Sequence, residues 1–256
     1  MLTTLVAGGL GAVLGAGPLA ASTGSTAGMD ARGPYELGPA VLHGAGDPSG
    51  AGDTRELVVL VHGMGRTPLS MWLLARRLEG SGYRVVRFGY RSTRGDLAEL
   101  GEGLARRAAE RTGDAPRVHF VGHSLGNIVI RCMLAHARPE RAGRVVMLAP
   151  PNQGSAAADR WARWVGWALP HIRELGTDAR ATARSLALPE DVEVGIIAGQ
   201  RDAKVRVHET HLEGARDHAV VPAFHTFIMN RPDVHRLVRD FLRDGRFPAA
   251  DAPPDA

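Results

Sequence analysis

The chain has 256 residues, of which 44% are hydrophobic and 23% charged, and its formal net charge is +4. These values exclude a disordered chain and fit one globular domain with a full core. Acidic residues are interspersed among the basic ones, and no basic stripe alternates with aromatic residues, so we do not expect nucleic acid as a partner.

The first 30 residues differ from the rest. The stretch from Leu2 to Ala20 is apolar and rich in Gly and Ala, and Ala20-Ala21-Ser22 resembles a small-residue cleavage site. No Lys or Arg precedes the stretch, although a signal peptide normally begins with one, and a misplaced start codon would account for that gap. Three interpretations stay open: an export signal, a membrane anchor or a disordered cytoplasmic tail. Export to the periplasm or the medium is slightly favoured, and residues 31–256 are expected to form the folded domain.

After a Gly-, Ser- and Pro-rich lead-in at 22–53, strands and helices alternate along the chain. Helical spacing of apolar residues covers 69–78, 97–108, 127–134 and 234–242. Strands are predicted at 57–61, 84–88, 117–121, 144–148, 192–198 and 218–221. This alternation predicts an α/β fold, with a mostly parallel sheet covered by helices on both faces. Residues 152–190 contain no strand signal and are expected to form a small helical cap insertion.

A short motif interrupts this alternation after the third predicted strand. Gly122-His123-Ser124-Leu125-Gly126 has the G-x-S-x-G pattern, with a strand-like run before it and a helix-like run after it. On such a turn the serine hydroxyl projects from the end of a sheet, where it serves as a nucleophile. The alternative is a Gly-rich turn whose serine only caps the helix. The context favours a serine hydrolase, with Ser124 as its nucleophile.

The serine needs a base, and the base needs a carboxylate that orients it. On a parallel sheet these groups come from loops at the carboxyl ends of the strands. Asp202 follows the fifth predicted strand by a few residues and is the expected acid. Asp191 and Asp217 each precede a strand and therefore lie at the wrong end.

The expected base is His225, because it lies between the sixth predicted strand and the final helix. His218 begins that strand, at the opposite end of the sheet. His208 and His211 fall in a polar stretch near Asp202, and His235 on the final helix is expected to be solvated.

Two backbone N–H groups should face the negative charge that develops on the substrate oxygen. The residue after the nucleophile, Leu125, supplies one of them. The second is expected from Met64, in the loop His62-Gly63-Met64-Gly65 after the first strand. The alternative for that loop is a plain Gly-rich connection without a catalytic role.

The insertion contains three of the four tryptophans, Trp161, Trp164 and Trp167, followed by Leu169 and Ile172. Spacings of three predict that the tryptophans share one helical face. Two interpretations stay open. The face either covers the active site and lines an apolar acyl pocket, or it buries the insertion against the sheet.

No metal or cofactor is expected. The sequence contains no H-E-x-x-H motif or Cys/His cluster, and no phosphate-binding glycine motif follows the first strand. The single cysteine, Cys132, cannot form an internal disulfide and is predicted to be a small core residue.

Taken together, residues 57–243 resemble a bacterial lipase or carboxylesterase of the α/β-hydrolase superfamily. The resemblance rests on VHGMG at 61–65, GHSLG at 122–126, LAPPNQGS at 148–155, GQRD at 199–202 and HTF at 225–227. It implies the chain order Ser, acid, His and a small-molecule or lipid ester as the substrate. It also allows contact with a membrane or lipid surface, and it does not indicate the oligomeric state. The short segment between Gly199 and Asp202 and the modest size of the cap favour a small esterase over a large interfacial lipase. An amidase, a thioesterase and a non-catalytic binding protein on the same fold remain the alternatives.

Overall fold

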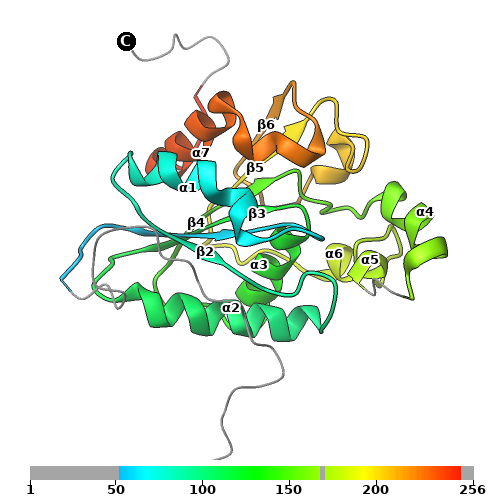
Figure 1. The fold of residues 1–256 in the computed structure, drawn as a ribbon, viewed down its shortest axis with the longest axis horizontal. Coiled ribbons are helices and arrows are strands. Elements are labelled where there is room, and N and C mark those ends of the chain that lie inside the picture. Colours follow the sequence, from blue (N-terminus) through cyan, green and yellow to red (C-terminus); the bar gives the residue numbers. More distant parts are fainter. Residues whose placement is uncertain (1–51, 168–170, 249–256) are drawn as a thin grey trace, which may run out of the picture. The chain divides into compact units, whose positions relative to one another are not determined.

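The computed structural model describes residues 52–167 and 171–248 (Figure 1). The segment predicted as an export signal or anchor lies outside the described residues, and so does Leu169 of the insertion. Among the helices that the structure describes, none is long and apolar enough to cross a bilayer.

Six strands form one sheet in the order β2-β1-β3-β4-β5-β6, and every neighbouring pair is parallel. The strands are β1 (Leu57–Val61), β2 (Arg84–Phe88), β3 (Val118–His123), β4 (Ala142–Leu148), β5 (Val194–Gly199) and β6 (Asp217–Val221). The predicted α/β fold with a parallel sheet is therefore confirmed.

Helices cover both faces of the sheet, with α1 and α7 on one face and α2 and α3 on the other (Figure 1). Their bounds are α1 (Trp72–Glu79), α2 (Leu97–Thr112), α3 (Leu125–His136) and α7 (Pro232–Asp244). Three 3₁₀ turns, η1 (Pro68–Met71), η2 (Val207–Thr210) and η3 (His225–Asn230), lie in the connecting loops.

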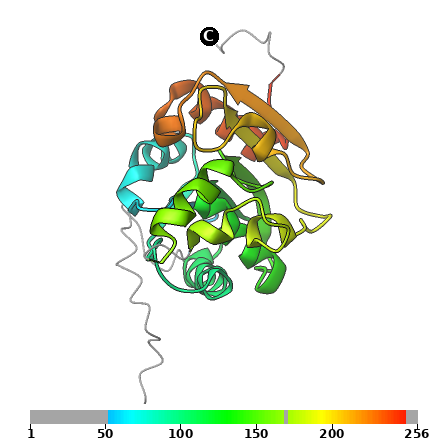
Figure 2. The ribbon, with the colours of Figure 1, turned by 90° about the vertical axis from the view of Figure 1, so that its right-hand side faces the viewer.

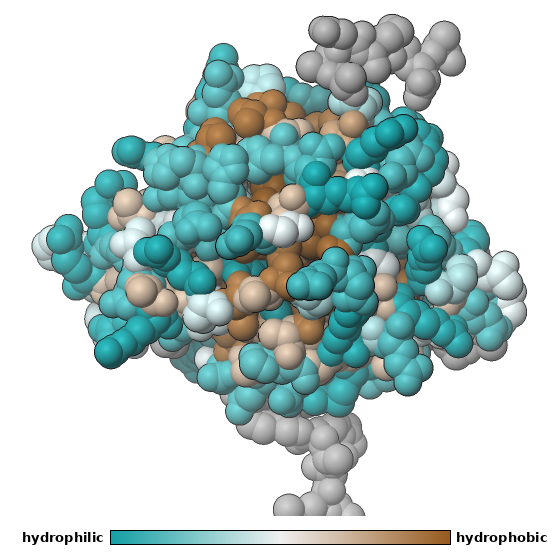
Figure 3. Space-filling view, turned by 180° about the vertical axis from the view of Figure 1, so that it is seen from behind, coloured by the Kyte–Doolittle hydropathy of each residue, from teal (hydrophilic) through white to brown (hydrophobic). Residues whose placement is uncertain are grey.

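The strand β1 shows how one sequence serves both faces, because successive side chains of a strand point to opposite sides. Val58 and Leu60 pack with α1 and α7, whereas Val59 and Val61 pack with α2 and α3. All five residues of β1 are buried, and each buried aliphatic side chain contributes about 2 kcal/mol. Seen from behind, the face of the molecule is largely hydrophilic, with hydrophobic residues showing in its middle (Figure 3).

The predicted insertion contributes α4 (Ala156–Val165), α5 (His171–Glu174) and α6 (Thr182–Ser185) at the carboxyl ends of the strands (Figures 1 and 2). Its described residues contain no strand, as expected. Ser155 caps α4 by accepting a hydrogen bond from the N–H of Ala158 at 3.2 Å.

A buried arginine fixes the second half of the insertion to α3. Arg131 donates to the backbone oxygens of Ala183, at 2.7 Å, and of Leu186, and to Asn152 Oδ1 at 3.2 Å. Burial lowers the pKa of Arg131 to about 10, so the guanidinium stays charged near neutral pH and its hydrogen bonds are charge-assisted.

The prediction that His235 is solvated is wrong. The ring lies on the side of α7 that faces η3, where its Nε2 donates to the backbone oxygen of Met229 at 2.6 Å. The hydrogen bond satisfies a carbonyl that would otherwise be buried without a donor. The helical spacing of α7 alone does not reveal this contact, because it does not indicate how the preceding turn η3 packs against the helix.

Candidate active site

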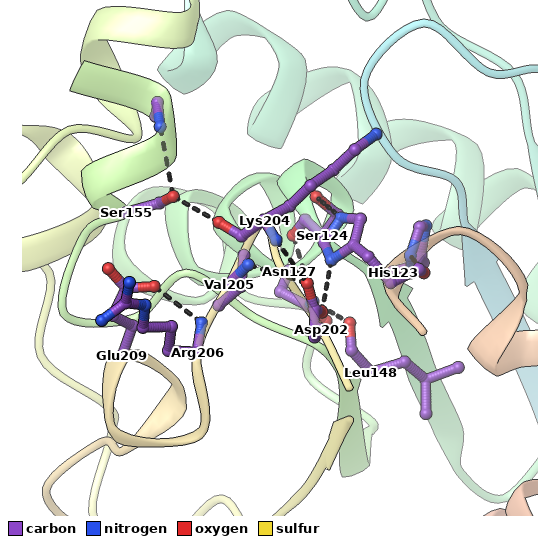
Figure 4. A network of polar contacts seen from close by, with 12 residues as sticks. His123, Ser124, Asn127, Leu148, Ser155, Asp202, Lys204, Val205, Arg206 and Glu209 are labelled. Atoms are coloured by element: carbon purple, nitrogen blue, oxygen red, sulfur yellow. Dashed lines mark hydrogen bonds and ion pairs between the residues drawn. The ribbon is translucent and has the colours of Figure 1, made fainter. Parts of the chain in front are cut away.

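Ser124 lies on the turn between β3 and α3, with φ of 52° and ψ of −121° (Figure 4). This left-handed backbone is costly for a residue with a side chain and persists only where its surroundings hold it. Here the backbone N–H and the side-chain amide of Asn127 both donate to the Ser124 carbonyl oxygen at 3.0 Å. The Ser124 N–H in turn donates to the Leu148 oxygen at 3.0 Å.

The two glycines of the motif are required by close packing. A Cβ at Gly122 would lie 2.9 Å from the Asn127 nitrogen, and one at Gly126 would lie 2.7 Å from the His62 oxygen. Both distances are shorter than real Cβ contacts allow, so any side chain would displace the turn.

The structure brings the three predicted side chains together, although they are far apart in the sequence. His225 Nε2 lies 3.0 Å from Ser124 Oγ, and His225 Nδ1 lies 2.6 Å from Asp202 Oδ2. All three residues are less than 10% exposed. With a carboxylate beside Nδ1, that nitrogen carries the proton, and Nε2 is left to accept the Ser124 hydroxyl proton.

Asp202 is held by its own loop. Its Oδ1 accepts hydrogen bonds from the N–H groups of Lys204 and Val205, both at 2.8 Å (Figure 4). One carboxylate oxygen thus binds the backbone while the other faces His225, which fixes the orientation of both side chains.

The competing residues lie elsewhere. Asp191 is exposed and pairs with Arg138 at 2.6 Å, while an Asp217 oxygen accepts the N–H of Phe247 at 2.7 Å. His218 Nε2 lies 2.8 Å from Thr210 Oγ1. Asp191 precedes β5, whereas Asp217 and His218 lie at the start of β6. These strand ends point away from Ser124, which explains why the three residues do not join the site.

The two expected oxyanion donors flank the serine. In the described part of the chain, the N–H groups of Met64 and Leu125 form no hydrogen bond with a protein atom. Leu125 begins α3, so its N–H is among those that a helix leaves unpaired. Gly63 brings the Met64 loop close, since a Cβ there would lie 3.2 Å from Ser124 Cβ and 2.8 Å from His123 Nδ1.

Two side chains from the loop after β2 hold the Met64 loop in place. The Tyr90 hydroxyl donates to the His62 oxygen at 2.6 Å, and the two rings stack at 4.4 Å between centroids. The Ser92 hydroxyl accepts the N–H of Gly65 at 2.9 Å. The sequence analysis missed both residues, because no motif marks them.

His123 was also missed as a functional candidate, although it is the variable second residue of the motif. Its Nε2 donates to the backbone oxygen of His225 at 2.9 Å. The ring is buried, and burial is the main cause that lowers its pKa well below the ordinary value. His123 is therefore neutral and links the nucleophile turn to the segment that carries the candidate base.

A cavity of about 440 Å³ opens beside Ser124 and His225. Its apolar wall consists of Ala157, Ala158, Trp161, Ile172, Leu175 and Val205, five of which belong to the insertion. The cavity has a size and lining typical of small-molecule sites. In the part of the chain that the structure describes, no cluster of His, Cys, Asp and Glu suits a metal ion.

Only Trp161 fits one of the two interpretations of the tryptophans. Trp161 lines the cavity, whereas Trp164 and Trp167 are 78% and 85% exposed and line neither the cavity nor the core. The prediction of one shared helical face is wrong for Trp167, because α4 ends at Val165 and Gly166 follows it. Burial of the insertion is achieved instead by residues such as Ile172 and Leu175.

The sequence matches the profile of the Alpha/beta hydrolase family over residues 58–253. The chain belongs to the alpha/beta hydrolase family. The match begins in β1 and includes the turn at Ser124, the insertion and both segments with the candidate acid and base. Among curated proteins, none matches the sequence significantly.

Solved structures of other alpha/beta hydrolases share the fold. The mature Bacillus licheniformis lipase BlEst2 superposes with a TM-score of 0.57 at 19% identity, over 72% of this chain and 91% of the lipase. The Paleococcus ferrophilus monoacylglycerol lipase gives 0.54 at 18%, over 75% and 96%. Aspergillus fumigatus lipase B gives 0.64 at 14%, over 79% of this chain, which spans 55% of that longer protein. At these identities, the likeness concerns the fold.

Proposed function

We propose that this alpha/beta hydrolase cleaves carboxylic esters through an acyl-enzyme formed on Ser124. The observation that carries the proposal is the 3.0 Å approach of His225 Nε2 to Ser124 Oγ, with Asp202 on the other ring nitrogen at 2.6 Å. The apolar cavity beside the serine supports an acyl group as the bound moiety. The solved structures named as lipases and a monoacylglycerol lipase support an ester over other acyl compounds.

In the first half of the proposed reaction, Ser124 Oγ attacks the ester carbonyl carbon while its proton passes to His225 Nε2. The N–H groups of Met64 and Leu125 stabilise the oxyanion. Asp202 stabilises the imidazolium, which then protonates the leaving alcohol as the carbon–oxygen bond breaks. In the second half, water attacks the acyl-enzyme and gives its proton to His225. His225 then returns a proton to Ser124 Oγ as the bond between this oxygen and the acyl carbon breaks and the acid is released.

The test is hydrolysis of p-nitrophenyl esters of increasing acyl length by the full chain and by its Ser124→Ala variant. We expect turnover with the unaltered chain and a loss of roughly 10⁴- to 10⁶-fold in kcat with the variant. Equal activity of the two proteins would contradict the proposal. The chain-length optimum then separates a small esterase from a lipase.

An amidase or a thioesterase would use the same residues, so p-nitroanilides and acyl thioesters belong in the same panel. If the unaltered chain hydrolyses one of these and no ester, the triad assignment stands and the bond type changes. If nothing is hydrolysed, a non-catalytic binding protein becomes the better description.

We also propose that the exposed tryptophans contact an anionic lipid surface that presents the ester. Trp161 is 60% exposed at the cavity, and Trp164 and Trp167 are more exposed still. Arg160 and Arg163 are exposed on the same helix and form no ion pair with a described residue. Indole rings beside arginines are typical of helices that lie at a membrane interface.

A further inference from the structure

The cavity beside Ser124 has two cationic side chains on its wall, Arg66 and Lys204. Arg66 follows the loop that carries Met64, and Lys204, the only lysine of the chain, follows Asp202. Among the residues that line the cavity, none is an Asp or a Glu. Figure 4 shows the Lys204 side chain extending from its loop toward the side on which Ser124 lies.

Neither cation has a carboxylate partner among the described residues. The Arg66 guanidinium lies 5.6 Å from the centroid of the exposed Phe227 ring. The nearest carboxylate in the sequence to Lys204, Asp202, is occupied by His225 and two backbone N–H groups. Both positive charges also act on the interior of the site: after burial and the neighbouring His225, Arg66 and Lys204 contribute to the lowered pKa of His123.

The rest of the wall includes the polar side chains of Ser155 and Thr226 and a group of apolar side chains. The apolar side chains are those of Ala157, Ala158, Ile172, Leu175 and Val205. They carry no hydrogen-bonding group, so a charged group among them would lose its hydration without compensation. An acyl chain suits that part of the cavity. A negative charge on the substrate therefore suits the neighbourhood of Arg66 and Lys204, and with the acyl chain in the apolar part this charge falls to the alcohol.

We propose that the preferred substrate is an ester of an apolar acid with an alcohol that carries a carboxylate or a phosphate, bound by Arg66 and Lys204. The inference rests on the proposed function only for the ester bond itself. Arginine binds such groups through paired N–H donors, and lysine as a compact charge, so the two together select an anion without fixing its exact geometry.

The test measures binding and not turnover, so that it remains valid if the bond type is different. The full-length Ser124→Ala protein is titrated by calorimetry with phenyl butyrate, 3-carboxyphenyl butyrate and 3-(trimethylammonio)phenyl butyrate. We expect the carboxylated ester to bind about fivefold more tightly than the neutral one, and the cationic ester to bind most weakly. Replacing the carboxylate by a phosphate in a fourth probe decides which anion is preferred.

Arg66→Gln and Lys204→Gln are then introduced into this background. Each should reduce the roughly fivefold preference for the anionic over the neutral probe to about twofold, the pair should abolish it, and Arg66→Lys should retain most of it. Arg106→Gln, which removes an exposed charge from α2 outside the cavity, serves as the control and should leave the preference intact.

Three results would overturn the proposal: no preference for the anionic probe, equal weakening of both probes in the Arg66 and Lys204 variants, or the same change in the Arg106 control. Failure of the ester hypothesis looks different. In that case the unaltered chain leaves every ester intact, while the anionic preference and its dependence on Arg66 and Lys204 persist.

Discussion

His123 donates a hydrogen bond to the backbone oxygen of His225 at 2.9 Å, and their rings lie 5.0 Å apart between centroids. The two residues are 102 positions apart in the sequence. The residue next to the candidate nucleophile thus holds the backbone of the candidate base. The distance between Ser124 Oγ and His225 Nε2 depends on this contact as well as on Asp202.

From this contact we predict that His123 is a positioning residue. His123→Phe keeps a ring of similar size but cannot donate, so kcat on p-nitrophenyl butyrate should fall about tenfold while KM changes little. His123→Gln restores a donor and should recover part of kcat. A purely structural role would instead lower thermal stability in both variants without this split between kcat and KM.

Asp202→Asn should preserve the packing around His225 and remove the negative charge. We expect kcat to fall by roughly 10³- to 10⁴-fold. The asparagine neither stabilises the imidazolium nor holds neutral His225 in the tautomer with its proton on Nδ1. The matched control is Asp191→Asn, which changes an exposed aspartate before β5. Steady-state kinetics of both variants decides the matter, and comparable losses in the two would disprove the assignment of the acid.

Gly63→Ala tests the oxyanion loop. The added methyl group would lie 2.8 Å from His123 Nδ1 and 3.2 Å from Ser124 Cβ, so the loop must retreat from the serine. We predict a loss of about 10²-fold in kcat as the Met64 N–H moves away from the substrate oxygen. Gly80→Ala is the control, because its φ is −63° and its nearest contacts are 3.5 Å away. Unchanged kcat in Gly63→Ala would argue against this donor.

Stability should decline in mild acid because several histidines are buried in the neutral form. Burial lowers the pKa of His62 from 6.5 to about 4, and it also lowers the pKa of His119, His123 and His235. The unfolded chain binds these protons more tightly than the folded one. The stabilisation is therefore complete above pH 6.5 and is lost as the pH falls toward 4.

For His62 alone, the lowered pKa corresponds to roughly 3 kcal/mol of unfolding free energy across that interval. Urea unfolding at pH 7.5 and pH 5 should show the loss in the unaltered protein. His62→Phe, which cannot be protonated, should show a smaller difference between the two pH values. An identical pH dependence in both proteins would contradict the prediction.

The exposed tryptophans are tested with vesicles. Trp164→Ser combined with Trp167→Ser should weaken binding to vesicles that contain anionic lipid by at least about tenfold, because two large apolar side chains no longer leave water. Hydrolysis of a soluble short-chain ester provides the comparison on the same variant. Trp72→Ser, at a half-exposed tryptophan of α1, is the control. Equal vesicle binding by all three proteins would remove the lipid surface from the proposal.

The sequence by itself determined the order of the elements and the candidate triad. Buried parallel strands have continuous apolar runs, as at 57–61, and the G-x-S-x-G motif marks Ser124 because only glycines fit beside that turn. Asp202 and His225 followed from a topological rule, since in a parallel sheet the carboxyl ends of all strands meet at one edge. These features are local or periodic, so a linear pattern records them.

Which polar side chains support the site, and which surfaces stay open, followed from the three-dimensional packing alone. His123, Tyr90 and Ser92 each form a hydrogen bond with a backbone atom of a segment far away in the sequence, and such contacts leave no pattern in the sequence. Helical spacing alone also misplaces His235, which is buried against the preceding turn η3, and Trp164, which it puts on an apolar face although the side chain is exposed. Packing between segments that are far apart in the sequence determines which partner each side chain contacts. The physical basis of this packing is the removal of apolar surface from water.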